Sequence, residues 1–426
     1  MNTPKHTFSR YQIFVIAILA ILQFTIILDF MVLSPLGPFL MKELNMHASQ
    51  FGLVVSAYAF SAGISGLLAA GFADKFDRKR LLMFFYMGFI LGTALCAMAP
   101  NFGFLLFARI VTGIFGGVIG SISFAIITDL FKMEVRGRVM GFVQMAFAAS
   151  QVLGLPIGLV LANHFGWHAP FWMIAGFGVV LGMVMLVYLQ PVNEHLKLKR
   201  SEHNAFKHLS QTISQPNYLK AFLGTTLLAT GGFMLMPFGS AFSTHNMGVP
   251  IEKLSLLYFV TGIFSMILGP LSGKISDKIG KYKMFVIGSI ISIIMVAIYT
   301  NLGVTPLWTV IGLNILLFAG ISSRMISASA LMTAVPKAQD RGAFMSINSA
   351  IQQISGGIAA TVAGLIVVEA KDGKLENYNV LGYVVIIAMV IAIGMMYFIN
   401  KLVMDQLHAK PAEKPTEEPV EIIAEV

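Results

Sequence analysis

The sequence predicts an all-α membrane protein, built from twelve transmembrane helices in two similar halves. Of its 426 residues, 57% are hydrophobic and only 12% are charged, whereas soluble domains carry about 25% charged residues. Apolar runs of roughly twenty residues recur along the chain, long enough for a helix to cross about 30 Å of hydrocarbon. A charged segment from Ala70 to Leu81 recurs in similar form from Gly273 to Lys283, each time between two long apolar runs.

The apolar runs do not show the alternation that transmembrane β-strands require. As helices, the predicted spans are 11–38, 48–72, 81–99, 103–128, 138–162, 169–189, 219–243, 252–275, 283–302, 307–332, 342–368 and 379–402. The longest connection is polar and basic, and it divides six spans from six. We therefore predict a six-helix bundle at 1–189, a linker at 190–218, a second bundle at 219–402 and a disordered, Pro- and Glu-rich tail at 403–426.

The positions of Lys and Arg predict the orientation. The termini and the loops on their side hold 23 of the 29 Lys and Arg residues, and the opposite loops hold four. Because cytoplasmic loops are enriched in these residues, we expect both termini in the cytoplasm. Trp167, Trp172 and Trp308 then fall at the outer interface, where an indole ring is favoured. The net charge of +9 is thus a topology signal, so we expect membrane lipid as a partner and no nucleic acid.

The two halves repeat each other beyond the charged segment. Phe30-Met31 followed by Pro35 corresponds to Phe233-Met234 followed by Pro237, and the LLFA sequence at 105–108 recurs at 316–319. Two six-helix halves of the same orientation, joined by a basic linker, resemble the parallel repeats of the major facilitator superfamily over nearly the whole chain.

The charged segments carry part of this resemblance. The family's loop between spans two and three reads approximately G-x-L-x-D-R-x-G-R-K. The first copy departs from this pattern at Ala70 and Asp77, whereas the second copy fits it at Gly273, Asp277, Lys278, Gly280 and Lys281. The resemblance implies a cytoplasmic gate in which Asp74, Arg78 and Asp277 latch neighbouring helix ends. The alternative, that the cations only set the topology, stays open.

Two charged residues lie inside apolar spans. A carboxylate at membrane depth is costly, which makes Asp29 in span one a functional candidate. With a rise of about 1.5 Å per residue, Asp29 lies roughly 24 Å from the inner face and Arg109 of span four roughly 9 Å from the outer face, so both fall at similar depth. An adjacent arginine favours the ionised acid, and separation in a nonpolar site favours the protonated one, so this pair is a candidate for proton coupling.

This pair resembles the drug:proton antiporter branch of the family, which has an acid in span one and, in span four, an arginine followed four residues later by a glycine, here Gly113. The alternative is a static ion pair that holds two helices together. Span five contains Gly154, Pro156 and Gly158, which predict close helix packing and a helix irregularity. They resemble the glycine-proline motif of exporters in the arabinose-efflux-permease-like branch, although Leu155 and Leu159 depart from its commoner form.

Other polar residues within spans are candidates for a substrate cavity between the halves, because polar side chains facing lipid are unfavourable. They are Gln23, Gln144, Gln151, Asn314, Asn348, Gln352 and Gln353. Each is equally compatible with a hydrogen bond between helices. We expect Arg324 of span ten to be a rim charge near the inner mouth. No histidine spacing predicts a metal site, and no cofactor is expected.

The resemblance implies a secondary active transporter of a bacterial inner membrane, which acts as a monomer and exports a small molecule, drug-like or a sugar or metabolite, by alternating access with proton antiport. The chain lacks a phosphate-binding G-x-x-x-x-G-K-[ST] loop, so neither ATP-driven transport nor an enzyme is expected. Two alternatives remain. One is a sugar or metabolite importer or uniporter in which Asp29 and Arg109 contact substrate, and the other is a non-transporting sensor or scaffold.

Overall fold

The computed structural model describes residues 8–69, 75–131, 133–193, 196, 205–337, 340–370 and 373–408. Within these residues, twelve helices are long and apolar enough to cross a membrane. The predicted all-α membrane fold with twelve spans is therefore confirmed. Which side of the membrane holds the termini stays a prediction.

The first half contains α1 (Arg10–Val32), α2 (Gly37–Glu43), α3 (Ala48–Ala69), α4 (Arg78–Ala97), α5 (Phe102–Leu130), α6 (Met133–Ala149), the π-helical segment η2 (Ser150–Gly154), α7 (Leu155–Phe165) and α8 (His168–Tyr188). The short helix α9 (Ala205–Ile213) lies in the connection.

The second half contains α10 (Pro216–Leu235), the 3₁₀ segment η4 (Met236–Phe238), α11 (Gly239–His245), the 3₁₀ segment η5 (Ile251–Lys253), α12 (Leu254–Ile279), α13 (Lys281–Tyr299), α14 (Leu307–Ala334), α15 (Arg341–Ile366) and α16 (Tyr378–His408). Strands β1 (Val368–Glu369) and β2 (Leu375–Glu376) form an antiparallel hairpin before α16.

Helix ends follow from local sequence. Ser9 and Gln12 form a capping box at the start of α1, and Asn101 caps α5 by accepting a hydrogen bond from the Phe104 amide. These side chains satisfy amide groups that the first helical turn leaves free. Gly280, with φ of +98°, separates α12 from α13, a backbone conformation that glycine adopts without steric cost.

Two spans that we predicted as single helices are broken, and they break at repeat-related positions. Span 11–38 ends as α1 at Val32, turns, and resumes as α2; span 219–243 passes from α10 through η4 into α11. Pro35 and Pro237 lie in these breaks, and proline removes a helical hydrogen bond and clashes with the preceding turn. The break in span five is the π-helical segment η2, directly before Pro156.

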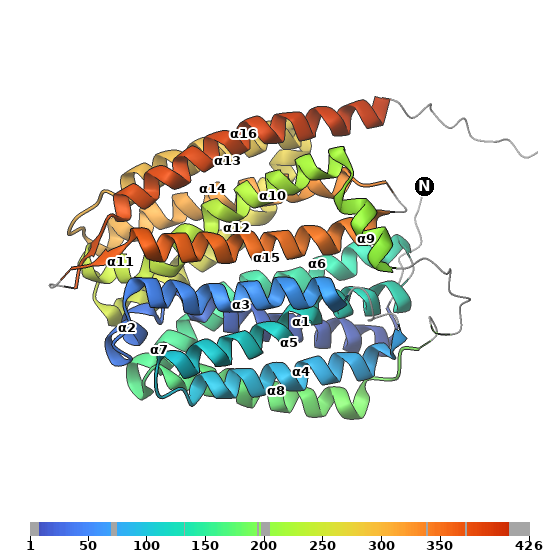
Figure 1. The fold of residues 1–426 in the computed structure, drawn as a ribbon, viewed down its shortest axis with the longest axis horizontal. Helices are drawn as coiled ribbons and strands as arrows, with labels where there is room; N and C mark the ends of the chain where they lie inside the picture. Colours follow the sequence, from blue (N-terminus) through green and yellow to red (C-terminus); the bar gives the residue numbers. More distant parts are fainter. Residues whose placement is uncertain are drawn as a thin grey trace, which may run out of the picture.

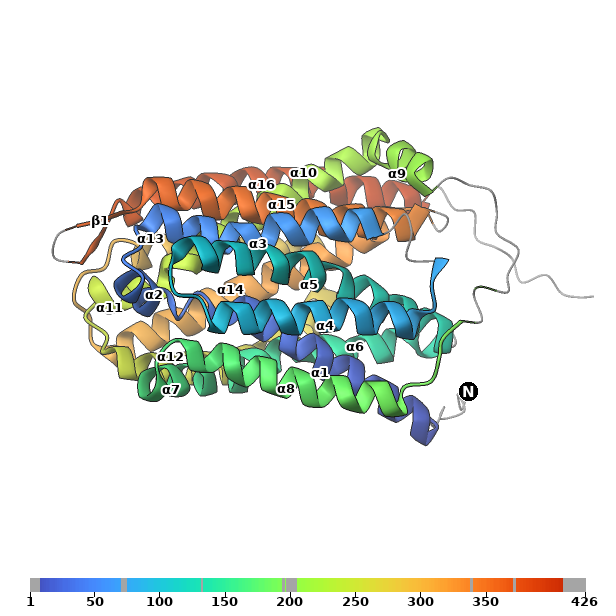
Figure 2. The same cartoon turned by 60° about the horizontal axis from the view of Figure 1, so that its bottom comes forward.

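The short elements and the chain ends lie at the two ends of the bundle. Helices α2 and α11 and the β1–β2 hairpin lie at one end, which we name the α2 end (Figures 1 and 2). The start of α1, helix α9 and the end of α16 lie at the opposite end, the α9 end. Our predicted orientation places the α2 end outside and the α9 end in the cytoplasm.

The halves meet along α3 and α15, which lie side by side (Figure 1), and where α12 packs on α7 and η2. Towards the α2 end, the Ser34 hydroxyl donates a hydrogen bond to the Met236 carbonyl, and the Thr361 hydroxyl donates one to Ser56 Oγ over 2.9 Å. The part of α12 nearer the α9 end is mostly exposed. The halves are therefore closed against each other at the α2 end.

Two further predictions need correction. Trp172 and Trp308 are exposed, but Trp167 is buried inside the protein, because its ring stacks on His168 with centroids 3.8 Å apart. The expected disordered tail at 403–426 begins too early, because α16 continues to His408; residues 409–426 lie outside the described part of the chain.

Candidate functional site

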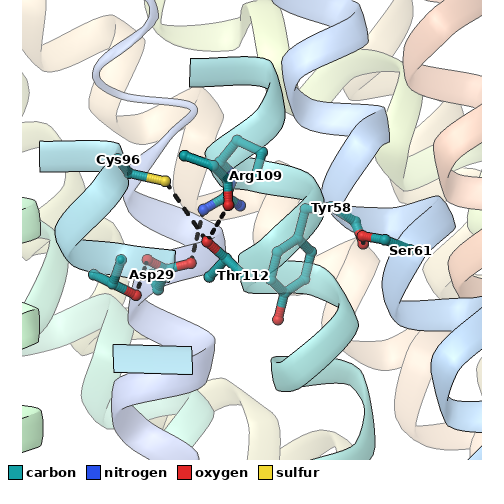
Figure 3. A network of polar contacts seen from close by, with 8 residues as sticks. Asp29, Tyr58, Ser61, Cys96, Arg109 and Thr112 are labelled. Atoms are coloured by element: carbon teal, nitrogen blue, oxygen red, sulfur yellow. Dashed lines mark hydrogen bonds and ion pairs between the residues drawn. The ribbon is translucent and has the colours of Figure 1, made fainter. Parts of the chain in front are cut away.

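Asp29 of α1 and Arg109 of α5 form an ion pair inside the first half (Figure 3). Arg109 Nη1 donates to Asp29 Oδ2 over 2.7 Å, and both side chains are 0% exposed. Sequence analysis placed the two residues at similar depth, and the fold brings them into direct contact. A buried ion pair needs close geometry of this kind, because each charge loses its hydration on burial.

Four further residues lie around the pair. The Thr93 hydroxyl of α4 donates to Asp29 Oδ1 over 3.1 Å, and the guanidinium carbon of Arg109 lies 4.6 Å from the centre of the Tyr58 ring of α3. Cys96 lies 3.6 Å from the Thr112 hydroxyl in the same network (Figure 3). The Nε and Nη2 atoms of Arg109 are buried without a hydrogen bond in the described residues.

Sequence analysis missed Thr93 and Tyr58. Both lie in apolar spans that pack against α5, and neither type of side chain is unusual in a transmembrane helix. The available signal was their location on spans two and three, which have to surround the acid and the arginine in a six-helix bundle.

Gly113 sets how closely α5 approaches α3. A Cβ atom at Gly113 would lie 2.0 Å from the Ser61 hydroxyl oxygen and 2.5 Å from the Tyr58 carbonyl oxygen. Only glycine fits this contact without a shift of the helices. The contact is one helical turn from Arg109, so it positions the guanidinium over the Tyr58 ring.

Gly154 and Gly158 give span five a similar close approach to α1. A Cβ atom at Gly154 would lie 2.5 Å from Leu28 Cδ1, and one at Gly158 would lie 3.0 Å from Val32 Cγ2. Pro156 lies between them at the start of α7, directly after the π-helical segment. Span five therefore packs against α1 beside Asp29, and its irregularity lies at that level.

Of the residues expected to form the cytoplasmic gate, Arg78 is buried and Asp277 is exposed. Arg78, at the start of α4, is buried, and its Nε lies 3.2 Å from Oδ2 of Asp129 at the end of α5; Asp129 was not among the predicted residues. Asp277 forms an exposed ion pair with Lys281 across Gly280, and such pairs contribute little to stability. Asp74 lies outside the described residues, so a gate at this end stays a prediction.

The predicted cavity residues fall into two groups. Asn348 and Gln352 are partly buried on neighbouring turns of α15, and Asn348 Oδ1 accepts a hydrogen bond from Thr225 of α10 over 2.5 Å. Gln353 lies beside Gly63 of α3, at the interface between the halves.

The other group is spread over both halves. Gln151 is buried in η2, where its backbone packs against Gly262 of α12. Asn314 is buried and donates to the Val310 carbonyl of its own helix. Gln23 is partly buried on α1, and the side chain of Gln144 lies outside the described residues. Their role in binding stays a prediction.

The expectation for Arg324 is wrong. The residue is 4% exposed and is not a rim charge. Its guanidinium carbon lies 5.7 Å from the centre of the Phe285 ring of α13. In a helix the side chain leans towards the helix N-terminus, and at Arg324 this direction carries the charge back into the bundle.

Comparison with known proteins agrees with this architecture. The model of the Major Facilitator Superfamily matches residues 19–360 and 221–424. The MFS-type transporter YceJ of Bacillus subtilis (strain 168), which is described as uncharacterized, is 27% identical over 285 residues, covering 67% of this chain and 71% of that protein. Multidrug resistance protein 2 of the same organism is 25% identical over 256 residues, covering 59% of this chain and 64% of that protein.

Solved structures share the fold. A bacterial homologue of the human lysosomal transporter Spinster, in an inward-facing and unoccupied conformation, gives a TM-score of 0.73 at 15% identity and covers 94% of this chain and 99% of that one. A mutant of the nucleoside transporter NupG gives 0.71 at 13% identity, with 91% and 99% covered. The chain therefore belongs to the Major Facilitator Superfamily and is a multi-pass membrane transporter, not an enzyme.

Proposed function

We propose that this transporter exports a small molecule by alternating access in exchange for protons, with Asp29 as the proton carrier and Arg109 as the group that controls its ionisation. The cytoplasmic membrane of a bacterium is the proposed location, and the two halves of one chain form the whole pathway, so the proposed unit is a monomer.

The observation that carries this proposal is the fully buried contact between Asp29 and Arg109. In the state described here, Arg109 and Thr93 both donate to the carboxylate, so its charge is balanced by a cation in direct contact. If α1 and α5 shift so that the guanidinium no longer reaches Asp29, the carboxylate loses its counter-charge in an apolar site. Binding a proton then becomes the least costly way to keep it there.

Export is favoured over import by two observations. The glycine-proline segment of span five packs directly on α1 beside Asp29, as expected for the exporter motif that it resembles. One relative is named a multidrug resistance protein. Because this segment packs on the helix that carries the proton carrier, bending of span five would be coupled to proton exchange.

The test is solute-driven proton flux in proteoliposomes that contain the purified protein. A pH-sensitive dye inside the vesicles reports proton movement after addition of tetraphenylphosphonium, chloramphenicol or arabinose, which represent lipophilic cations, neutral drugs and sugars. Wild type is compared with Asp29→Asn, which keeps the size of the side chain but replaces the carboxylate with an amide that cannot bind and release a proton. Asp405→Asn on exposed α16 is the charge-matched control.

We expect flux for wild type and the control, and none for Asp29→Asn while solute binding persists. Normal flux in Asp29→Asn would reject the assignment of Asp29. Solute movement without any proton flux in wild type would instead support a uniporter, in which Asp29 and Arg109 contact the substrate.

A further inference from the structure

The second half holds a buried cation that the proposed proton-coupling site does not use. Arg324 of α14 is 4% exposed, and its Nε and Nη2 atoms form no hydrogen bond within the described residues. Arginine stays protonated in proteins, so a full positive charge lies inside this bundle. The ring of Phe285, 5.7 Å away, contacts one face of the guanidinium and leaves the N–H groups at its edge unsatisfied.

The LLFA repeat aligns Arg109 of the first half with Gly320, so Arg324 lies one helical turn beyond the position that corresponds to the arginine of the ion pair. The offset between Phe30-Met31 and Phe233-Met234 places Gly232 where the first half has Asp29. Beside it, a Cβ atom at Gly231 would lie 3.8 Å from Nη1 of Arg324. The second half therefore places its arginine next to the helix that corresponds to α1, but that helix carries Gly232 where α1 carries the acid.

No acidic side chain of the neighbouring helices replaces the missing carboxylate. The sequences of α10, α13, α14 and α15 contain no Asp or Glu. The one acid of α16, which also packs on α10 and α13, is Asp405, and it is exposed near the end of that helix. Asp277, near the end of α12, is exposed and paired with Lys281. A buried charge without a counter-charge is strongly unfavourable, so the site is suited to an anion that comes from outside the chain.

The surroundings of Arg324 offer space and further donors. A Cβ atom at Gly232 would meet no atom within 4 Å, and Gly232 is exposed. The hydroxyl groups of Ser289 on α13 and Ser327 on α14 are buried without a hydrogen-bond partner in the described residues. Ser327 lies one turn after Arg324, and Ser289 lies one turn after Phe285.

The charge of the nearby α9 end favours entry of an anion. Lys274, Lys278 and Lys283 are exposed at the junction of α12 and α13, and Phe285 follows two residues after the last of them. A cluster of cations at the mouth of a low-dielectric site raises the local concentration of anions.

We propose that Arg324 binds an oxyanion beside Gly231 and Gly232: either the carboxylate, sulfonate or phosphate group of the transported solute, or a free inorganic oxyanion. The planar guanidinium binds two oxygens of such a group at once. Identifying the anion as part of the cargo rests on the proposed transport function, whereas the binding itself does not.

The experiment measures the apparent Tm of the full-length protein in detergent at constant ionic strength. The probes are sodium benzoate, inorganic phosphate and benzamide, the uncharged analogue of benzoate. We expect benzoate, phosphate or both to raise the Tm of wild type by roughly 3 °C or more at saturation, because a ligand that binds only the folded state stabilises it. Benzamide is expected to have no effect.

Four variants locate the effect. Arg324→Met keeps much of the volume and removes the charge, and we expect it to fold and to lose the anion-dependent shift. Lys401→Met removes the same charge from an exposed position on α16 and is expected to keep the shift. Gly231→Asp supplies a carboxylate beside Arg324, and we expect a higher Tm without anion and no further rise with it. Gly231→Asn controls for the added side chain and is not expected to raise the Tm without anion.

The outcomes separate the sources of the anion. A shift with benzoate, together with Arg324-dependent counterflow of radiolabelled benzoate in proteoliposomes, identifies an organic anion as cargo. A shift with phosphate alone identifies a free inorganic oxyanion. No anion-dependent shift in wild type, or a shift that persists in Arg324→Met, overturns the proposal. Because this assay needs no proton flux, its failure leaves the role of Asp29 to its own test.

Discussion

The ring of Phe233 in the second half packs against the ring of Phe30 in the first, with centroids 5.7 Å apart. Phe30 follows Asp29 directly and also packs on Tyr58, with centroids 5.4 Å apart; Tyr58 in turn lies beneath the guanidinium of Arg109. A contact between the halves is therefore connected to the buried ion pair through two aromatic rings. We therefore expect that separation of the halves at the α2 end would remove Phe233 from Phe30 and change the support of the ion pair.

This relationship predicts that Phe233→Ala weakens the coupling between the halves and the ion pair. An aromatic pair contributes about 0.5–1.5 kcal/mol, so we expect the closed state to lose roughly 2- to 12-fold in population. Solute-driven proton flux in proteoliposomes should fall while solute binding remains. Phe84→Ala is the control, because Phe84 is 63% exposed and its ring contacts among the described residues are with Phe85 and Phe115 of the first half. Equal flux in the two variants would contradict the connection.

Much of the fold followed from the sequence, because the bilayer imposes long apolar runs that are easy to recognise. The same length argument brought Asp29 and Arg109 to a similar depth, and they do form a pair. The breaks at Pro35 and Pro237 were not predicted, because an apolar run does not show where a helix bends, and prolines are tolerated in membrane helices when neighbouring groups satisfy the free carbonyls.

The partners of the charged residues were harder to predict. Thr93 and Tyr58 contact the pair from spans whose rotation about their axes is set by packing, including the close contact at Gly113, and not by hydrophobic periodicity, since these spans are apolar all round. Arg324 was misplaced for the same reason. Depth along a helix follows from counting residues, whereas the direction of a side chain depends on the neighbouring helices.

The buried ion pair predicts strongly non-additive effects on stability. Arg109→Gln leaves the Asp29 carboxylate buried without its counter-charge, and Asp29→Asn leaves the Arg109 guanidinium buried without one. Removal of one partner of a buried ion pair costs about 3–5 kcal/mol of stability. The double variant removes both charges, so we expect it to be more stable than either single variant. Equilibrium unfolding in mixed detergent micelles measures this double-mutant cycle. Additivity within about 0.5 kcal/mol would show that the pair is not energetically coupled.

Two hydrogen bonds between the halves predict how the α2 end opens. Ser34→Ala removes the bond to the Met236 carbonyl, and Thr361→Val removes the bond to Ser56. A hydrogen bond contributes about 1 kcal/mol net, so each change should shift the equilibrium roughly fivefold towards a state open at this end.

Spin labels at exposed Lys42 and Glu252, in a Cys96→Ala background, measure the distance between the halves at the α2 end. We expect a larger fraction of long distances in each variant. Ser265→Ala is the control, because that hydroxyl bonds only to a carbonyl of its own helix in the described structure. If all three variants give the distance distribution of the wild type, these hydrogen bonds do not hold the end closed.

The last prediction concerns Gly113, a position where α5 lies close to α3. In Gly113→Ala the new methyl group would approach the Ser61 hydroxyl to 2.0 Å and the Tyr58 carbonyl to 2.5 Å. The hydroxyl can rotate away, but the carbonyl belongs to the backbone, so α5 has to move and carry Arg109 off the Tyr58 ring. We expect a loss of about 1–3 kcal/mol in stability together with a loss of proton flux. Gly120→Ala, on the same helix with no atom within 4 Å of its Cβ position, should be neutral or stabilising by up to roughly 1 kcal/mol. Replacing Ser61 with glycine in the Gly113→Ala background should recover little, because the carbonyl contact remains. Equal Tm and equal flux for the alanine variants at 113 and 120 would show that this close approach does not position the ion pair.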